Sequence, residues 1–144
     1  MKELEKKAFI FGTIFTLANK LQVIGDQFDK NITTKQWLFI LGVSVFKEAP
    51  MISELANFLG YSRQNAKRIA SDLSKTGFVS ICCDSLDARA LRIELTPKCR
   101  EYFEKRDKRE IEFLEKLFTG FDSKQTDHLF DGIIKLEKNI KEVM

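Results

Sequence analysis

The chain has 144 residues, of which 44% are hydrophobic and 31% charged, a balance typical of one soluble globular domain. Its 7 Gly and 2 Pro are too few for a disordered or collagen-like chain, or for the many turns of an all-β sandwich, so we expect a mostly helical fold. The net charge of +3 identifies no partner, but residues 61–100 carry +4 and the rest of the chain −1. That segment suits a polyanion, although a solvated surface has the same character.

Several functional classes have no support in the sequence. The first residues carry charges of both signs without a secretory layout, and no apolar run approaches the ~18 residues of a membrane span, so we expect a cytoplasmic protein without a membrane partner. Cys82 and Cys83 lack a Cys-x-x-Cys spacing and His128 is the single histidine, so we expect no metal and no cofactor. Without a glycine-rich phosphate loop or a nucleophile paired with a histidine, we do not expect an enzyme.

Residues 4–28 are predicted to form a helix that is apolar on two sides. One stripe is Leu4, Ala8, Phe11, Phe15 and Ala18, and the other is Ile10, Ile14, Leu17, Leu21, Ile24 and Phe28. Both stripes have the three-and-four spacing of a helix. Such a helix is either the centre of a core or an element with one side against a second chain. We favour the second, because one domain of this size rarely surrounds its own first helix.

Residues 53–73 match a helix-turn-helix. Ser53 is predicted to cap the first helix, Gly60 to form the turn, and Ser62 to cap the second helix. Ala56 is small enough to let the two helices approach closely. This spacing favours a second helix that projects into a DNA major groove, although ordinary helical hairpins share parts of the pattern.

The outward face of that second helix carries side chains suited to DNA. The periodicity that buries Ala66, Ile69, Ala70 and Leu73 leaves exposed Arg63, Gln64, Asn65, Lys67 and Arg68. Arg, Gln and Asn have the bidentate geometry that recognises base edges. A face made only for solubility is the alternative, but Glu and Lys serve that purpose better than Gln and Asn.

A β-hairpin is predicted directly after the helix-turn-helix. Residues 78–82 and 91–95 are β-prone, and the polar residues between them indicate an exposed tip. The combination is a winged helix. Arg89 suits a narrow minor groove, where negative potential is concentrated, and Asp87 is placed to orient it. A surface salt bridge of little consequence is the alternative.

Further helices flank this region. Thr33 with Gln36 predicts a capped helix that ends before Pro50. Thr96-Pro97 predicts the start of a long helix that Gly120 ends. A last helix, capped by Asp122 or Ser123, carries a short heptad seam of Leu129, Ile133, Leu136, Ile140 and Val143. The seam is too short for a coiled coil by itself, so we expect it to pack into a larger helical assembly.

A series of short motifs runs through the chain: Ser53-Glu54-Leu55-Ala56, Ser62-Arg63-Gln64, Leu73 with Gly77-Phe78-Val79, Asp87-Ala88-Arg89 and Leu95-Thr96-Pro97. With these motifs the chain resembles the MarR family of bacterial transcription regulators over nearly its whole length. The resemblance implies one mainly α domain (α+β), with a winged helix-turn-helix lobe at 31–99 and dimerisation helices at 1–30 and 100–144. It further implies a homodimer that binds pseudo-palindromic double-stranded DNA.

The expected sites follow from these interpretations. The recognition-helix candidates are Ser62, Arg63, Gln64, Asn65, Lys67 and Arg68. The candidates for DNA-backbone and wing contacts are Thr34, Lys35, Lys75, Asp87 and Arg89. The dimer candidates are Leu4, Phe11, Leu129, Ile133, Leu136 and Ile140. Similar proteins often bind small aromatic or anionic effectors, and the pocket candidates are Phe11, Phe15, Phe39 and Phe103, with core packing as the alternative.

The expected function is a dimeric, sequence-specific DNA-binding transcriptional regulator, a repressor released by a small-molecule effector. The alternative is a winged-helix module for protein contacts without DNA affinity, which an acidic or apolar second helix would indicate. Oxidation of Cys82 or Cys83 at the wing is a further hypothesis, and their packing as small apolar residues is its alternative.

Overall fold

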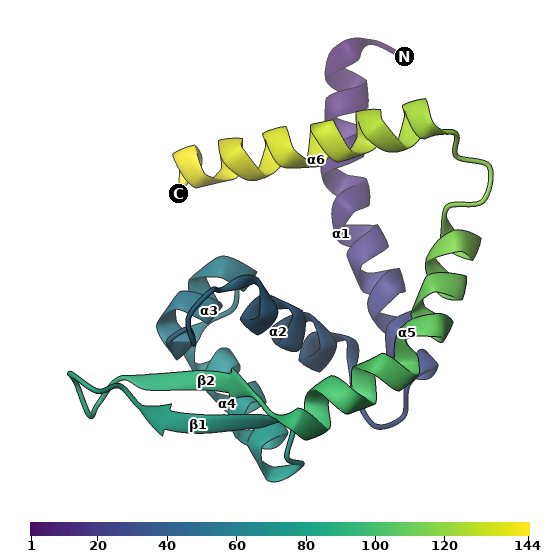
Figure 1. Cartoon of the computed structure of the whole chain (residues 1–144). Coiled ribbons are helices and arrows are strands. Elements are labelled where there is room, and N and C mark those ends of the chain that lie inside the picture. The colour runs from purple at the N-terminus through teal and green to yellow at the C-terminus, as the bar shows by residue number, and fades with distance from the viewer. The chain divides into compact units, whose positions relative to one another are not determined.

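The computed structural model describes all residues 1–144 and has the mainly helical fold that the sequence predicts, with one small hairpin (Figure 1). In chain order the elements are α1 (Glu3–Phe28), α2 (Thr34–Val45), α3 (Ile52–Leu59), α4 (Arg63–Lys75), β1 (Val79–Cys83), β2 (Leu91–Leu95), α5 (Pro97–Leu117) and α6 (Ser123–Val143). The chain divides into two compact units, Met1–Tyr102 and Phe103–Met144, so the boundary lies inside α5.

Side-chain caps explain where the middle helices begin. The Thr33 hydroxyl accepts a hydrogen bond from the Gln36 backbone N–H at 3.2 Å, and the Gln36 side chain accepts one from the Thr33 N–H at 3.0 Å, as predicted. The predicted cap at Ser53 is wrong. Helix α3 already begins at the residue before it, because the Glu54 carboxylate accepts a hydrogen bond from the Met51 N–H at 3.0 Å.

The core of the first unit lies where α2, α3, α4 and the hairpin meet. Its largest fully buried side chains include Phe39, Ile32, Leu55, Leu73 and Ile93. Ala56 and Ala66 are buried, and their small size lets α3 and α4 pack closely. Gly60 takes a left-handed conformation (φ 74°) and ends α3, as predicted. The inward face predicted for the second helix of the helix-turn-helix is confirmed, because all four of its predicted residues in α4 are buried.

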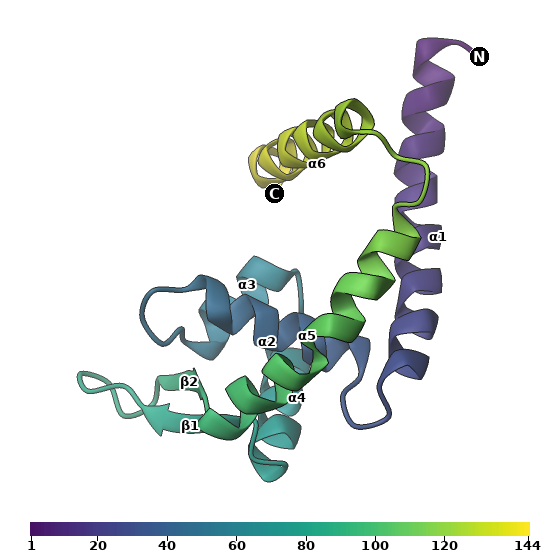
Figure 2. The same ribbon diagram turned by 45° about the vertical axis from the view of Figure 1, so that its right-hand side comes forward.

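The hairpin follows α4 directly and projects from the helices of its unit (Figures 1 and 2). Strands β1 and β2 pair antiparallel, in register from Val79 opposite Leu95 to Cys83 opposite Leu91. At its base, the Thr96 hydroxyl donates to the Gly77 carbonyl at 2.6 Å and accepts a hydrogen bond from the Cys99 N–H at 3.2 Å. Thr96 thus caps α5, as predicted, and joins that cap to the hairpin.

Helices α1 and α2 meet at a close contact that Gly25 permits. The Thr34 hydroxyl donates to the Gln22 carbonyl at 3.1 Å, and the Thr34 N–H donates to Asp26 Oδ1 at 2.7 Å. A Cβ atom on residue 25 would overlap the Thr34 hydroxyl. Glycine is therefore required here for the approach of two helices.

A buried carboxylate, Asp29, stands just after α1 and is 7% exposed. It accepts hydrogen bonds from the Asn31 N–H at 2.8 Å and from the Tyr102 hydroxyl at 2.5 Å. The Tyr102 ring also packs edge-on against Phe78, with the ring centroids 5.2 Å apart. Because a buried carboxylate is costly without partners, these bonds hold the end of α1 against the start of α5.

Helix α1 buries no residue within the single chain, so its interpretation as a central core helix is wrong. Its exposed large hydrophobic residues are Leu4, Phe9, Ile10, Phe11, Ile14, Phe15, Leu17, Leu21, Val23 and Ile24. By length and composition alone α1 is sufficient to cross a membrane, which corrects the expectation that no apolar segment is long enough. Core helices of soluble proteins and signal sequences meet the same criterion.

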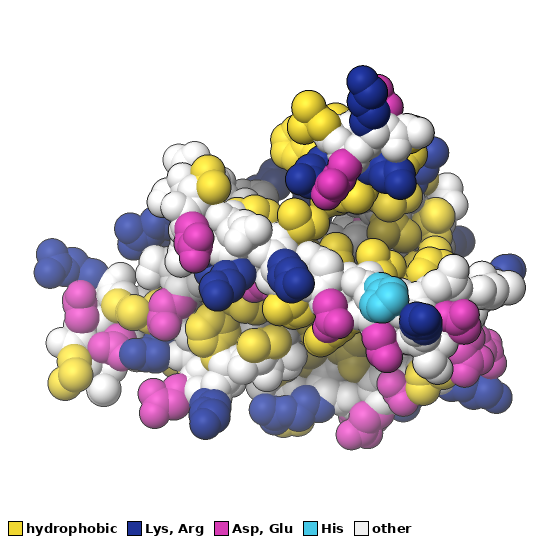
Figure 3. All heavy atoms as spheres, turned by 90° about the horizontal axis from the view of Figure 1, so that it is seen from above, with side chains coloured by type: hydrophobic (Ala, Val, Ile, Leu, Met, Phe, Trp, Pro, Cys, Tyr) yellow, Lys and Arg dark blue, Asp and Glu magenta, His cyan; other side chains and the backbone are white.

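In the second unit, Gly120 (φ 85°) follows α5 and Asp122 caps α6, accepting a hydrogen bond from the Gln125 N–H at 2.8 Å. Every residue of α6 is exposed within the single chain. Its large hydrophobic residues are Leu129, Phe130, Ile133, Ile134, Leu136, Ile140 and Val143. Figure 3 shows hydrophobic side chains open to solvent on this face of the molecule, together with the single histidine, His128, in cyan.

Candidate nucleic-acid interface

The outer face of α4 presents the polar residues that the sequence predicts there. Arg63, Gln64, Lys67 and Arg68 are exposed, and Asn65 is half-buried. The Ser62 hydroxyl caps the helix by accepting a hydrogen bond from the Asn65 N–H at 3.1 Å. The Arg68 guanidinium donates to the Asn65 side-chain oxygen at 2.8 Å. Because helix N-termini carry partial positive charge, Arg63 and the helix end together attract anions.

Arg92 pairs with Asp84 inside the hairpin and joins the hairpin to the segment between α2 and α3. Arg92 Nε donates to Asp84 Oδ1 at 2.5 Å, and Arg92 Nη1 donates to the Ala49 carbonyl, also at 2.5 Å. Ala49 lies between α2 and α3, so one guanidinium spans the hairpin and the helical part of the lobe. Sequence reasoning missed this pair, whose only signal is an acid and a base at opposite ends of the predicted tip.

The same guanidinium, followed by the Leu86 N–H, holds the pKa of Asp84 below its usual value. Its charged form is favoured because it accepts several hydrogen bonds at once. Asp84 is therefore ionised while it organises the wing.

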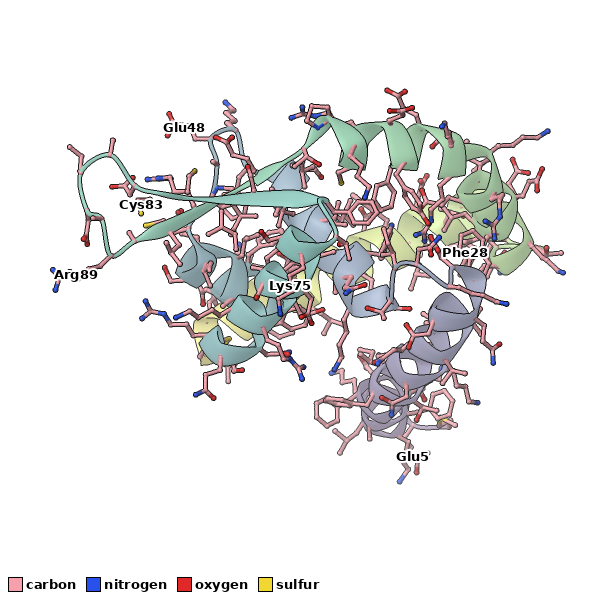
Figure 4. The ribbon with its side chains drawn as sticks, turned by 90° about the horizontal axis from the view of Figure 1, so that it is seen from below. Glu5, Phe28, Glu48, Lys75, Cys83 and Arg89 are labelled. Atoms are coloured by element: carbon pink, nitrogen blue, oxygen red, sulfur yellow. The ribbon has the colours of Figure 1, made fainter.

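Hydrogen bonds to two carboxylates hold the wing tip in one conformation. Asp84 Oδ2 accepts hydrogen bonds from the N–H groups of Leu86 and Asp87, both at 3.1 Å. Asp87 Oδ1 accepts one from the Arg89 N–H at 3.0 Å and lies 3.5 Å from Arg89 Nε. The Arg89 side chain is 95% exposed and points outward at the end of the hairpin (Figure 4). The predicted bond between Asp87 and Arg89 is present, and the exposed pair adds little stability.

Cations from α4 and from the wing converge on one shallow hollow of about 90 Å³. Arg63 and Lys67 line it from α4, and Arg89 lines it from the hairpin. The rest of the lining is Met51, Ile52, Ser53, Ala90 and Leu91. Three of the eight lining residues are therefore cationic, and none is acidic.

The remaining candidates for contact with a DNA backbone differ in availability. Thr34 is the least available, because its hydroxyl and its N–H are both used in hydrogen bonds to α1 and hold the two helices together. Lys35, in the first turn of α2, is exposed. Lys75 is exposed at the C-terminal end of α4 (Figure 4).

The four phenylalanines expected to line an effector pocket have different surroundings. Phe39 is fully buried in the core of the lobe, which is the alternative that the sequence left open. Phe11 and Phe15 are exposed on α1 and contact each other edge-on, with centroids 5.2 Å apart. Phe103 belongs to the second unit, where the Arg106 guanidinium lies over its ring at 5.3 Å. None of the four lines the basic hollow.

The cysteines are all free thiols. Cys82 and Cys83 are both exposed on β1, so the interpretation that they pack as small apolar residues is wrong. Cys99 is buried at the start of α5, and burial raises the pKa of its thiol.

No family model and no curated protein matches the sequence. Solved structures do match. A MarR transcriptional regulator from Methanosarcina mazei Go1 is 22% identical, with a TM-score of 0.85 over 95% of this chain and 99% of that chain. A MarR protein from Peptoclostridium difficile is also 22% identical, with a TM-score of 0.82 over 92% of this chain and 88% of that chain. This chain has the MarR fold.

A more distant match is BpsR of Bordetella bronchiseptica, whose DNA binding is regulated by 6-hydroxynicotinic acid. It is 15% identical, with a TM-score of 0.73 over 88% of this chain and 91% of that chain. The MarR resemblance that the motifs indicate is thus confirmed for the fold. At these identities the likeness concerns the course of the backbone, so the chemistry of this MarR-fold chain has to be argued from its own side chains.

Proposed function

We propose that this chain is a dimeric, sequence-specific DNA-binding transcriptional regulator that acts in the cytoplasm. The observation that carries the proposal is the convergence of Arg63, Lys67 and Arg89 on one hollow between α4 and the wing. Two consecutive elements, a helix and a hairpin, contribute residues of the same charge to the same space, which suits the phosphate backbone of a duplex. The similarity of the fold to that of the MarR transcriptional regulator from Methanosarcina mazei supports the proposal.

In the proposed complex, α4 enters the major groove and the wing reaches the adjacent minor groove. The exposed side chains of Arg63, Gln64 and Lys67 face base edges at the N-terminal end of α4. Arg89 enters the minor groove, and the strand of phosphates between the two grooves lies along the hollow. Lys75 contacts a phosphate farther along.

The proposed dimer buries the apolar sides of α1 and α6, which have no buried residue in the single chain. Exposed side chains such as Leu4, Phe11, Leu136 and Ile140 become buried against the second copy. Two lobes related by a two-fold axis then bind two half-sites about 34 Å apart, one turn of the duplex. A pseudo-palindromic site follows from that symmetry.

We also propose that the chain is a repressor, and that a small aromatic or anionic effector releases it from DNA. The support is BpsR, in which such a molecule regulates DNA binding. The measurement is DNA affinity with and without a panel of aromatic carboxylates. An effector should weaken binding without dissociating the dimer, whereas a panel that leaves affinity unchanged removes this part of the proposal.

Selection from a random duplex library with the full-length protein tests DNA recognition. The expected result is a palindromic motif with two half-sites. The variant Arg63→Ala/Lys67→Ala should lose this preference, while Lys108→Ala, an exposed cation on α5, should retain it. Recovery of no motif by the wild-type chain would reject the proposal. It would favour a protein-binding module, although the α4 face is basic rather than acidic or apolar. We propose no catalytic activity.

A further inference from the structure

A leucine occupies the tip of the wing, where the chain is otherwise polar. Leu86 is 96% exposed, the highest exposed fraction of any large hydrophobic side chain in the protein. The next most exposed, Met144 and Val143, stand at the end of the chain. Leu86 instead lies between Ser85 and Asp87, inside a structured turn. Single exposed leucines are ordinary, so its meaning depends on how it is held and on what stands beside it.

Leu86 is supported by a continuous series of hydrogen bonds that ends in the helical part of the lobe. Its backbone N–H donates to Asp84, Asp84 accepts from Arg92, and Arg92 donates to the Ala49 carbonyl. A second bond, from the Ala90 N–H to the Asp87 carbonyl at 3.0 Å, closes the tip. The side chain is therefore presented on a tip that hydrogen bonds connect to the helical part of the lobe.

We propose that Leu86 is a wedge that enters the DNA minor groove and partly unstacks one base step. This inference rests on the proposed function and specifies its mode of DNA recognition. Proteins that bind the minor groove insert apolar side chains, leucine among them, between base steps and bend the duplex. Arg89, on the same tip, supplies the cation that the groove attracts, and Leu86 supplies the apolar group that replaces stacking.

The wedge adds a preference that an arginine alone does not have. An arginine favours a narrow, rigid A-tract, whereas a wedge favours a pyrimidine–purine step such as TA, which is easily unstacked. The flank of each half-site should therefore be A·T-rich and interrupted by a TA step. Specificity arises there from deformability, without hydrogen bonds to bases.

The test uses a duplex selected by the full-length wild-type protein, with 2-aminopurine at the adenine of the flanking TA step. Wild-type protein should raise its fluorescence and bend the duplex in a transfer assay between labelled ends. Leu86→Ser should bind roughly tenfold more weakly, the lower end expected for losing a buried leucine, and should abolish both signals. Leu86→Met should restore most of them, and Ser85→Ala, on the same tip, should match wild type.

Replacing the TA step by AA should weaken wild-type binding and leave Leu86→Ser unaffected. Equal affinity, equal bending and equal fluorescence for wild type and Leu86→Ser would overturn the wedge while DNA recognition stands. A wild-type chain that selects no duplex would overturn the proposed function and this inference with it. Because Leu86 is exposed, circular dichroism should show unchanged folding in every variant.

Discussion

The lobe and the two apolar helices differ in whether the chain itself buries their hydrophobic side chains. In the lobe, Phe39, Leu55 and Ile93 are fully buried by the chain itself. Helices α1 and α6 have no buried residue at all within one chain. Because the hydrophobic effect acts equally on both regions, the lobe is stable by its own packing, whereas the helices need another apolar surface. The stability of the lobe should therefore be independent of protein concentration, whereas the stability of α1 and α6 should depend on it.

Truncating one phenylalanine in each region gives the largest expected contrast. Phe39→Ala should lower the free energy of unfolding by about 3–5 kcal/mol at any protein concentration, because it leaves a cavity in the core. Phe11→Ala, at an exposed position, should shift the unfolding midpoint only through association. Denaturant unfolding at two protein concentrations separates these effects. If Phe11→Ala lowered the free energy of unfolding by a similar amount at both protein concentrations, the proposed difference between the lobe and α1 would be contradicted.

Charges on the α6 seam should prevent association of the apolar helices without unfolding the lobe. Leu136→Asp with Ile140→Asp should give monomers or aggregates, because a dimer interface would have to bury unpaired carboxylates. Analytical ultracentrifugation at micromolar concentration measures this. The matched control is Lys138→Asp on the same helix. Wild-type protein that sediments as a stable monomer would contradict the dimer.

Changes on the outer face of α4 should leave both regions folded and reduce only DNA recognition. Among Arg63, Gln64, Asn65 and Lys67, each residue that contacts a base should cost about 1–3 kcal/mol when changed to Ala and relax one position of each half-site. Lys75→Ala should weaken all sequences alike and reduce the salt dependence, since we propose that Lys75 contacts a phosphate. Binding titrations on the selected duplex and its variants test this. Sequence preference that survives all four changes together would contradict the assignment of α4.

Changes at the wing should have a smaller effect in the same assay. Arg89→Ala should weaken binding generally, most on A·T-rich flanks, and Arg89→Lys should restore only part, because an ammonium is more strongly hydrated. Asp87→Ala should have a weaker effect, since we propose that Asp87 acts on DNA only through the neighbouring arginine. Titrations at two salt concentrations measure these losses. Unchanged affinity for Arg89→Ala at both would leave the pair as a surface salt bridge.

The smallest expected effect concerns pH. The pKa of Asp84 lies below its ordinary value in the folded chain, chiefly because of Arg92, so the pair stabilises the fold above the unfolded pKa of about 3.9. That contribution is lost as pH falls through the folded pKa. The stability difference between wild type and Asp84→Asn should therefore be constant near neutral pH and shrink only in acid. A difference that persists unchanged at low pH would contradict an ionised Asp84.

The helices and the hairpin were predictable because their signals are local. Caps such as Thr33 with Gln36, and the left-handed Gly60, act within a few residues of the boundaries that they set. The strand and helix periodicities around them also survive in the structure. Ser53 failed as a cap because Glu54 binds the helix end from inside the first turn, and a serine in the sequence does not reveal that competition.

The parts of the site that depend on contacts distant in sequence were not predictable. Arg92 binds Ala49 across 43 positions of the chain, so no local pattern identifies it as the support of the wing. Thr34 resembles a surface hydroxyl at a helix start, yet the neighbouring helix binds it. Phe39 and Phe11 have the same side chain and similar local patterns, and only the packing of the whole lobe makes one of them core.

Because residue 25 has no side chain, α1 and α2 pack directly against each other at their junction. Since any Cβ atom there would overlap the Thr34 hydroxyl, the two helices are seated at their closest approach. In a dimer joined through α1, the angle between α1 and α2 sets where each lobe lies. A small change of that angle would therefore produce a larger change in the distance between the two α4 helices. In the proposed dimer, the spacing of the two half-sites would then depend on the packing of α1 against α2 that Gly25 permits.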